Sequence, residues 1–201
     1  MAAERYLIVN ADDLGMSDAV NDGIFQAHEH GIVTSASLMV GRPAASTAVA
    51  VLAEHPDLAV GLHLEAGDDW WCQLERFREL VGRDPTHVDS HKHVHEAEPV
   101  TAVAEAMAAE LGVPLRGREV RYEGGFYGRA AISVEHLIEL IEALPPGWTE
   151  IGCHPAAGPV PSSSYDAERQ IELATLRDPR VKNLLDVTGV RLCSFAQVNR
   201  C

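Results

Sequence analysis

Short apolar segments alternate with amphipathic helical segments along almost the whole chain, and this order restricts the fold more than any other feature of the sequence. Each predicted strand except the last is followed by a helical pattern, as in a parallel sheet with helices packed outside it. The seven predicted strands are Tyr6–Val9, Ile32–Val40, Leu58–Leu64, His87–His93, Val113–Arg116, Trp148–Cys153 and Val190–Phe195. The alternation by itself is compatible with an open doubly wound sheet and with a closed or nearly closed barrel.

The predicted helices begin and end at typical capping residues. Ser17 and Ser133 are predicted N-caps, because a serine oxygen can accept a hydrogen bond from a free amide of the first turn. Gly31, Gly82 and Gly112 are predicted C-terminal stops. The remaining helical segments cover about 43–54, 71–81, 99–111 and 166–186, and a Pro- and Ser-rich loop covers 155–164. No linker or repeat interrupts this pattern, so we expect one domain over residues 1–201.

Composition excludes several classes of function. The chain has 30 acidic and 16 basic side chains and a net charge of −14, which argues against a nucleic-acid or anionic-membrane surface. No apolar run approaches the length of a membrane span, and the N-terminus lacks the apolar stretch of a secretory signal. We therefore expect a cytoplasmic protein. The four cysteines are far apart and predict reduced thiols; they are Cys72, Cys153, Cys193 and Cys201.

Unusual polar residues fall where the predicted strands end. Asp12 and Asp13 follow the first strand, His63 lies near the end of the third, and His154 follows the sixth. Ligands bind at the carboxyl ends of strands in parallel sheets of this kind, so these side chains are expected to converge. Successive strand residues point to opposite faces, so both aspartates can serve one site only if the chain leaves β geometry there. Gly15 makes such a departure easy.

The densest group of histidines lies at 87–95, where alternate positions are His87, Asp89, His91, His93 and His95. In an extended strand these side chains would share one face and lie about 6.6 Å apart. Zinc–nitrogen bonds are about 2.0–2.1 Å long, so one ion cannot bind all of them. We expect one or two to bind a metal ion and the others to contact these ligands or the substrate. The alternative is an exposed histidine-rich segment without a ligand.

His63 reaches the same end of the predicted sheet as Asp13 and His91. One carboxylate and two imidazoles suit Zn²⁺, Mn²⁺, Fe²⁺ or Co²⁺, and three protein ligands leave positions open, as catalytic metal sites do. Taken alone, each residue also has an ordinary explanation. An Asp pair stabilises a following helix N-terminus, His63 can be a hydrogen-bonded core histidine, and His154 can be a turn residue.

Four stretches are distinctive: IVNADDLG at 8–15, GLHL at 61–64, PTHVDSHKHVH at 85–95 and CHP at 153–155. With weaker similarities at 32–35, 126–128 and 191–195, they make the chain resemble the YdjC-like carbohydrate deacetylases, the chitooligosaccharide deacetylase family. The resemblance implies a distorted (β/α) barrel related to polysaccharide deacetylases. It also implies a hydrolase that removes acetyl groups from N-acetylated sugars or oligosaccharides.

The resemblance further implies the roles of individual residues. The implied ligands of one divalent ion, Zn²⁺ or Mg²⁺ first and Mn²⁺, Co²⁺ or Fe²⁺ as alternatives, are Asp13, His63 and His91. Asp12 is the implied base and His154 the implied acid. The expected contacts with the carbohydrate substrate are Arg116, Tyr127 and His93.

The chain departs from this family in length. Where family members carry a long insertion, the segment between His63 and His91 is only 64–90. That difference makes a homodimer a reasonable expectation, because a partner protomer can complete an open pocket. Two other functions stay in view: a phosphoesterase with two metal ions and cationic phosphate contacts, and a non-catalytic carbohydrate-binding relative.

Overall fold

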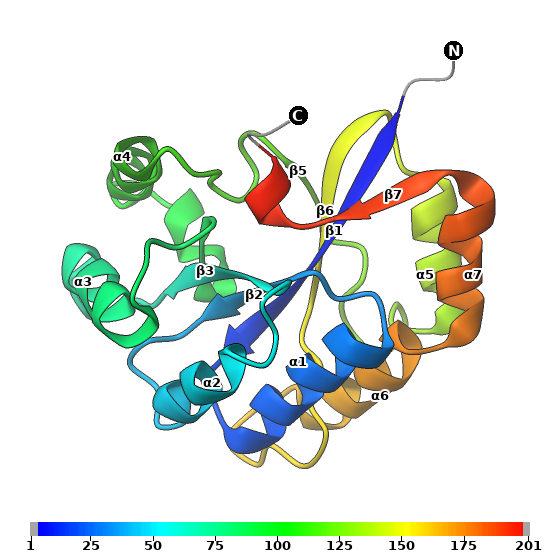
Figure 1. The fold of residues 1–201 in the computed structure, drawn as a ribbon, viewed down its shortest axis with the longest axis horizontal. Helices are drawn as coiled ribbons and strands as arrows, with labels where there is room; N and C mark the ends of the chain where they lie inside the picture. The colour runs from blue at the N-terminus through cyan, green and yellow to red at the C-terminus, as the bar shows by residue number, and fades with distance from the viewer. Residues whose placement is uncertain (1–3, 199–201) are drawn as a thin grey trace.

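The strands form one curled parallel sheet, and the helices pack around its outer face (Figure 1). The computed structural model describes residues 4–198. Its strands are β1 (Arg5–Leu14), β2 (Ser35–Leu38), β3 (Ala59–Leu64), β4 (Val88–Ser90), β5 (Arg121–Glu123), β6 (Gly147–Cys153) and β7 (Val190–Cys193). They lie in the order β4-β3-β2-β1-β6-β5, with β7 paired to β1 and every pairing parallel. The predicted distorted (β/α) barrel with about seven parallel strands is confirmed.

The helices lie where the capping residues predict them. They are α1 (Asp18–His30), α2 (Ala45–Leu52), α3 (Trp70–Val81), α4 (Thr101–Leu111), α5 (Val134–Glu142), α6 (Asp166–Leu176) and α7 (Pro179–Thr188), with 3₁₀ turns η1 (His91–Glu96) and η2 (Phe195–Gln197). The side chains of Ser17 and Ser133 cap α1 and α5, as expected. The segment 166–186 contains two helices, because Asp178 caps a new helix that starts at Pro179.

Strand β1 is the centre of the sheet. Its first half pairs with β7 on one side, its second half pairs with β2 on that side, and β6 runs along the other side. Beyond β4, isolated bridges join Val88 to Leu115 and Arg116 to Val120, shortly before β5 begins. The sheet thus curls toward closure, and the carboxyl ends of its strands surround one opening.

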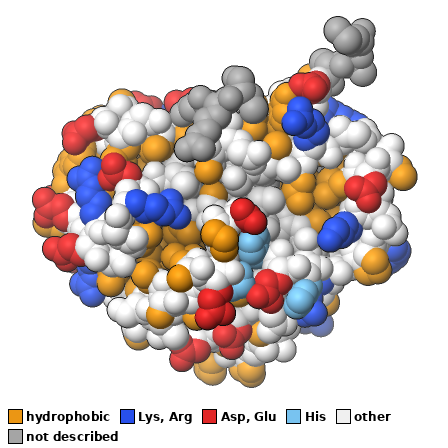
Figure 2. All heavy atoms as spheres, in the orientation of Figure 1, with side chains coloured by type: hydrophobic (Ala, Val, Ile, Leu, Met, Phe, Trp, Pro, Cys, Tyr) orange, Lys and Arg blue, Asp and Glu red, His pale blue; other side chains and the backbone are white. Residues whose placement is uncertain are grey.

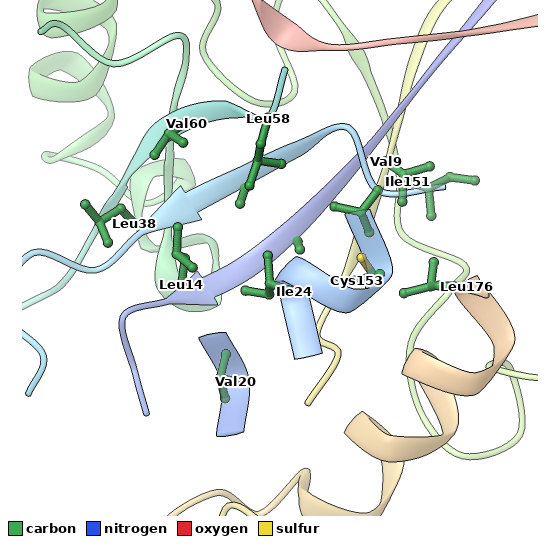
Figure 3. Packing of buried hydrophobic residues seen from close by; sticks show 14 of the residues in the cluster. Val9, Leu14, Val20, Ile24, Leu38, Leu58, Val60, Ile151, Cys153 and Leu176 are labelled. Atoms are coloured by element: carbon green, nitrogen blue, oxygen red, sulfur yellow. The ribbon is translucent and has the colours of Figure 1, made fainter. Parts of the chain in front are cut away.

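The two faces of the sheet differ in polarity. Val9 on β1 and Ile151 on β6 point outward and pack with Ile24 of α1 and Leu176 of α6 (Figure 3). Residues of the opposite parity on β1 and β6 point inward, and several are polar and buried, as are inward residues of β2 and β4; this set includes Asn10, Asp12, Ser37, Asp89 and Glu150. The apolar outer face therefore holds the helices, while the barrel interior carries hydrogen-bonding groups toward the opening.

The histidine-rich segment corrects the prediction of a strand over His87–His93. Strand β4 ends at Ser90, and the chain then turns into η1, where Lys92 and His93 have φ values of 56° and 53°. The Ser90 side chain accepts a hydrogen bond from the backbone amide of His95, at 3.0 Å, and so closes this turn. Only the first part of the predicted alternation lies on a strand face.

A second correction concerns the strand predicted over Val113–Arg116. That segment makes only the isolated bridges described above, since Pro114 has no amide hydrogen to donate to a ladder. The strand that pairs with the other edge of β6, opposite β1, is instead β5, which was not predicted. It is short and carries charged residues on an exposed edge, so its apolar pattern is weak.

The surface shows no concentration of basic side chains on the face drawn in Figure 2, where Lys and Arg are separated by acidic and apolar groups. Within residues 4–198, no helix combines the length and the apolar character needed to cross a membrane.

Candidate active site

A cleft of about 770 Å³ lies at the carboxyl ends of the strands. Side chains from β1, β3 and η1 line it together with the loops that follow β5 and β6. The lining residues used below are Asp12, Asp13, His63, His91, His93, Tyr127, His154, Tyr165 and Arg169. The polar strand-end residues predicted from the sequence therefore gather around one opening.

Asp12 and Asp13 both face this cleft although they are adjacent. Asp13 has a φ of 69°, and the pairing register of β1 with β2 shifts between Ala11 and Leu14. Aspartate adopts this left-handed conformation more readily than most residues. The chain leaves β geometry at this point, as the sequence argument required, and two carboxylates enter one site.

Asp13, His63 and His91 form a compact cluster of ligand atoms. Oδ1 of Asp13 lies 3.1 Å from Nδ1 of His91 and 3.6 Å from Nε2 of His63. One ligand atom from each of the three residues lies within 4.8 Å of the others. A carboxylate oxygen and two imidazole nitrogens at these distances fit a single divalent cation, so the donor set suits the ion that the sequence implies.

The far side of His63 is fixed by a buried carboxylate. Its Nδ1 lies 2.7 Å from Oδ1 of Asp89, while Oδ2 of Asp89 accepts a 2.6 Å hydrogen bond from the hydroxyl of Ser37. Asp89 is completely buried. This contact leaves Nε2 of His63 as the nitrogen that faces the cleft, which is the usual arrangement around metal-binding histidines.

The electrostatics of the cluster favour a cation. Burial would raise the pKa of Asp13, but hydrogen bonds to His63 and His91 hold it well below its usual value. Burial would lower the pKa of His63, yet the charge of Asp89 and hydrogen bonds to Asp13 and Asp89 raise it to about 10. The raised pKa of His63 reports a negative potential at its ring, and the lowered pKa of Asp13 means that this carboxylate stays ionised and can bind a cation.

Asp12 is held from behind by Arg116, which is 1% exposed. The guanidinium donates to both carboxylate oxygens of Asp12, at 2.8 and 2.6 Å, and also to Glu150, and lies 2.8 Å from Asp89. Burial would raise the pKa of Asp12, but the charge and hydrogen bonds of Arg116 lower it. The structure thus places Arg116 behind Asp12, outside the lining of the cleft where a substrate contact was expected.

His154 lies directly after β6, with Nε2 3.8 Å from Oδ2 of Asp12. Its backbone amide donates to Glu172 of α6, and its Nδ1 lies 4.0 Å from Oε1 of the same carboxylate. That Oε1 also accepts a 2.6 Å hydrogen bond from the hydroxyl of Tyr165. Burial raises the pKa of Glu172, although the charge of His154 opposes this.

Close packing fixes the loop that carries His154. A Cβ atom at Gly23 of α1 would lie 2.4 Å from Cα of Ala156, so only glycine lets the helix approach the loop this closely. Cys153 is fully buried on the outer face of β6, as expected of a core residue. The orientation of His154 is thus set by contacts on both sides of its strand end.

Aromatic rings form the outer rim of the cleft. Tyr127, which is 58% exposed, stacks on Tyr165 with ring centroids 4.6 Å apart and lies 5.5 Å from the ring of His154. On another part of the rim, the ring of His93 lies 4.9 Å from that of Tyr122. The two rim residues predicted from the sequence, Tyr127 and His93, are therefore accessible from the cleft.

Sequence reasoning missed two residues of α6. Arg169 donates a 2.6 Å hydrogen bond to Asp13, and Glu172 receives the amide of His154. Both are buried on the helix face that also carries Leu173 and Leu176. A charged pair at apolar-face positions of a helix is the signal that identifies such residues.

Comparison with known proteins identifies the family of this chain. The YdjC-like protein family matches residues 6–70 and 65–187. A carbohydrate deacetylase of Geobacillus stearothermophilus is 36% identical over 241 residues, covering 96% of this chain and 98% of the relative. A chitooligosaccharide deacetylase of Serratia marcescens is 32% identical over 249 residues, with the same coverage. Both alignments are longer than the 201-residue chain, so these relatives carry residues that this chain lacks.

Solved structures show the same fold. A putative cellobiose-phosphate cleavage protein of Enterococcus faecalis superimposes with a TM-score of 0.86 at 27% identity, covering 98% of this chain and 99% of that one. A family 4 carbohydrate esterase of Streptomyces lividans in complex with acetate gives a TM-score of 0.62 at 14% identity, covering 96% and 93%. The two family matches overlap at residues 65–70, which lie between the end of β3 and the start of α3. On the evidence of both matches and of these relatives, the chain belongs to the YdjC-like protein family.

Proposed function

We propose that this protein is a metal-dependent hydrolase that removes acetyl groups from N-acetylated sugars or oligosaccharides. One observation carries the proposal: the ligand atoms of Asp13, His63 and His91 lie within 4.8 Å of one another, beside the carboxylate of Asp12 and the imidazole of His154, which do not belong to that cluster. The deacetylase names of the two curated relatives support the substrate class. Zn²⁺ and Mg²⁺ are the first candidates for the ion, with Mn²⁺, Co²⁺ and Fe²⁺ as alternatives.

An amide is difficult to hydrolyse because its carbonyl is a poor electrophile and its amine a poor leaving group. A divalent ion held by Asp13, His63 and His91 supplies Lewis acidity, which polarises the carbonyl oxygen and lowers the pKa of water. The protein itself supplies the proton transfers. Asp12 has the lowered pKa of a carboxylate that stays ionised, so it can accept the proton of the attacking water.

To His154 we assign the donation of a proton to the departing amine. Its Nε2 faces the same volume as Asp12, and Glu172 holds the backbone of the histidine and faces its other ring nitrogen. General acid and general base steps of this kind contribute about 10²–10⁴-fold each. Because Asp13 is used as an ion ligand, the adjacent Asp12 is available as the base.

The rim provides candidate contacts for the sugar. Tyr127 offers an exposed ring face beside His154, and His93 lies across the cleft against Tyr122. Sugar rings pack their C–H faces against aromatic side chains, so we assign both residues to substrate binding. For Arg116 we propose an indirect role, since its guanidinium orients Asp12 and is buried.

A phosphoesterase is less well supported. Arg42 and Arg169 line the cleft but are paired with Glu65 and Asp13. A second group of close acidic and imidazole atoms includes Asp12 and Asp89, yet both carboxylates already contact Arg116. Lys92 also lines the cleft and makes no ion pair with the described residues there, but one lysine without a second ion position among them gives weaker support to a two-ion phosphate site than to a single-ion site.

The test is release of acetate from a series of N-acetyl sugars, from mono- to oligosaccharides, by protein loaded with each divalent ion. We expect turnover with one bound ion per chain. Asp12→Asn is the matched variant: it should retain the ion and lower turnover by about 10²-fold or more. Turnover at the wild-type level in Asp12→Asn would refute the assignment of the base. Ion binding without acetate release from any sugar would favour the non-catalytic, carbohydrate-binding alternative.

A further inference from the structure

Arg169 is a buried charge at the cleft that the mechanism above does not use. It lies on α6, 156 residues from Asp13, and is 3% exposed. One of its terminal nitrogens donates to Oδ2 of Asp13 at 2.6 Å. A buried arginine next to a proposed ion ligand repels the cation that the ligand is expected to bind. Attraction for the ion therefore cannot explain why Arg169 lies there.

The two oxygens of Asp13 face different partners. Oδ2 is occupied by Arg169, while Oδ1 faces His91 at 3.1 Å and His63 at 3.6 Å. A carboxylate can bind a cation through one oxygen or through both. The hydrogen bond from Arg169 occupies the second oxygen and leaves only the first for the ion.

We propose that Arg169 is a positioning residue that holds Asp13 as a one-oxygen ligand, and so keeps coordination positions of the ion open for water and the substrate carbonyl. The inference rests on the proposed function. Catalytic metal sites need such open positions, and each additional protein oxygen on the ion fills one of them.

Further contacts fix the guanidinium in place. Other nitrogens of Arg169 lie 3.5 Å from the backbone oxygen of His154 and 3.4 Å from the hydroxyl of Ser163. The backbone oxygen of Arg169 also accepts a hydrogen bond from the amide of Ala156, at 3.2 Å. The same side chain therefore spans the ends of β1 and β6, and joins the ion ligand Asp13 to the loop that carries the acid.

The test replaces Arg169 by Met, which keeps an unbranched apolar side chain but removes the charge and the donors. Binding of Co²⁺ is followed by calorimetry and by visible absorption, because the absorption bands of Co²⁺ weaken as its coordination number rises. We expect Arg169→Met to bind Co²⁺ about tenfold more tightly than wild type, since repulsion is removed and a second oxygen is freed. Its absorption should weaken, and acetate release should fall about tenfold or more.

The matched control is Arg177→Met, at the end of the same helix, where the arginine is exposed and donates to Gln26. It should leave the affinity, the absorption and the turnover at wild-type values. A merely structural role for Arg169 would instead weaken Co²⁺ binding. Unchanged or weaker binding by folded Arg169→Met overturns the inference.

A crystal structure of the Co²⁺-loaded wild type decides the question even if Arg169→Met fails to fold. One bound oxygen of Asp13 with Arg169 on the other is the expected result, and two bound oxygens, or no bound ion, would overturn the inference. Failure of the proposed function is a separate outcome. A wild type that binds Co²⁺ through one Asp13 oxygen but releases no acetate would refute the deacetylase and leave the role of Arg169 standing.

Discussion

The floor and the rim of the cleft are built on different principles. The floor consists of Asp12, Asp13 and His63 at strand ends, each buried and each in contact with a further buried charged group. The rim, represented by Tyr127 and His93, comes from loops and turns and is partly open to solvent. The floor is rigid because its charges satisfy one another, whereas the rim has few polar contacts to maintain.

This difference separates the residues proposed for catalysis from those proposed for substrate binding. The groups proposed for catalysis come from strand ends whose positions the sheet fixes, while the groups proposed for sugar binding can change without disturbing the sheet. The overlap of the two family matches, at 65–70, also falls on a connection between a strand and a helix and not on the sheet. Changes on the floor should therefore affect stability and turnover together, and changes on the rim should affect binding alone.

The largest expected effect comes from removing Arg116, the central cation of the floor. Arg116→Met leaves Asp12, Asp89 and Glu150 buried without their common partner. Breaking a buried ion pair in this way costs about 3–5 kcal/mol of unfolding free energy, which urea denaturation measures. The control is Arg118→Met, an exposed arginine paired with Glu105, which should leave the stability almost unchanged. Equal stability of the two variants would show that the floor charges do not support one another.

Two proposed ion ligands differ in burial, as the floor and the rim do. His63 is buried and bonded to Asp89, while the side chain of His91 is 29% exposed. Replacing either by Ala should abolish stoichiometric binding of a divalent ion. Only His63→Ala should also lower the free energy of unfolding, by about 2–4 kcal/mol, because it leaves a cavity and an unpaired carboxylate.

Metal analysis of the two variants measures ion binding. Thermal unfolding of both variants is measured after treatment with a chelator, so that loss of the ion does not contribute to the difference in stability. A His91→Ala protein that is as destabilised as His63→Ala would mean that the turn carrying His91 belongs structurally to the floor. Retention of the ion by either variant would remove that residue from the ligand set.

The sequence predicted the residues of the floor better than the buried residues that contact them. Strand-end position and the alternation of apolar and polar residues were enough to place Asp12, Asp13 and His63 at one opening. The partners Arg169 and Glu172 were not predicted: their charges on the apolar face of α6 indicate burial, but the helix sequence does not show which distant side chains they contact. Such pairs depend on how a helix packs on the completed sheet, which local patterns do not encode.

The histidine-rich turn shows that local sequence patterns also fail to predict the backbone conformation where other contacts determine it. The regular alternation at 87–95 predicts a strand, but the chain turns after Ser90 because its hydroxyl accepts the amide of His95. Lys92 and His93 then take left-handed conformations, which are uncommon for residues other than glycine, although histidine adopts them more readily than lysine does. A side-chain hydrogen bond and the surrounding packing override the periodic signal there, so the position of His93 on the rim could not be derived from spacing.

A smaller effect on stability should appear at acidic pH, and it comes from a histidine inside the barrel below the floor of the cleft. His87 is buried, with its ring nitrogens 3.0 Å from the hydroxyls of Ser37 and Thr86, and burial lowers its pKa to about 4 against the opposing charge of Asp89. In the unfolded chain this histidine takes up a proton near pH 6.5, while the folded protein resists until about pH 4. Its contribution to stability is thus complete above pH 6.5 and is lost as the pH falls toward 4.

The loss amounts to roughly 2–3 kcal/mol and should be absent in His87→Gln, measured as the difference in unfolding free energy between pH 7 and pH 4.5. His30→Gln, at the exposed end of α1, is the control and should follow the wild-type curve. An unchanged pH dependence in His87→Gln would show that the acid sensitivity arises elsewhere in the barrel.

The smallest expected effect tests the rim itself. Tyr127→Ala removes an exposed ring that stacks on Tyr165 and lies beside His154, so unfolding should change little. Its loss should raise KM for an N-acetylated oligosaccharide about fivefold to tenfold, equivalent to roughly 1 kcal/mol of stacking, and leave kcat nearly unchanged. Tyr127→Phe keeps the ring face and should behave as wild type. A fall in kcat as large as the rise in KM would place Tyr127 with His154 in the reaction itself, and the separation of chemistry from recognition would no longer hold on that side of the cleft.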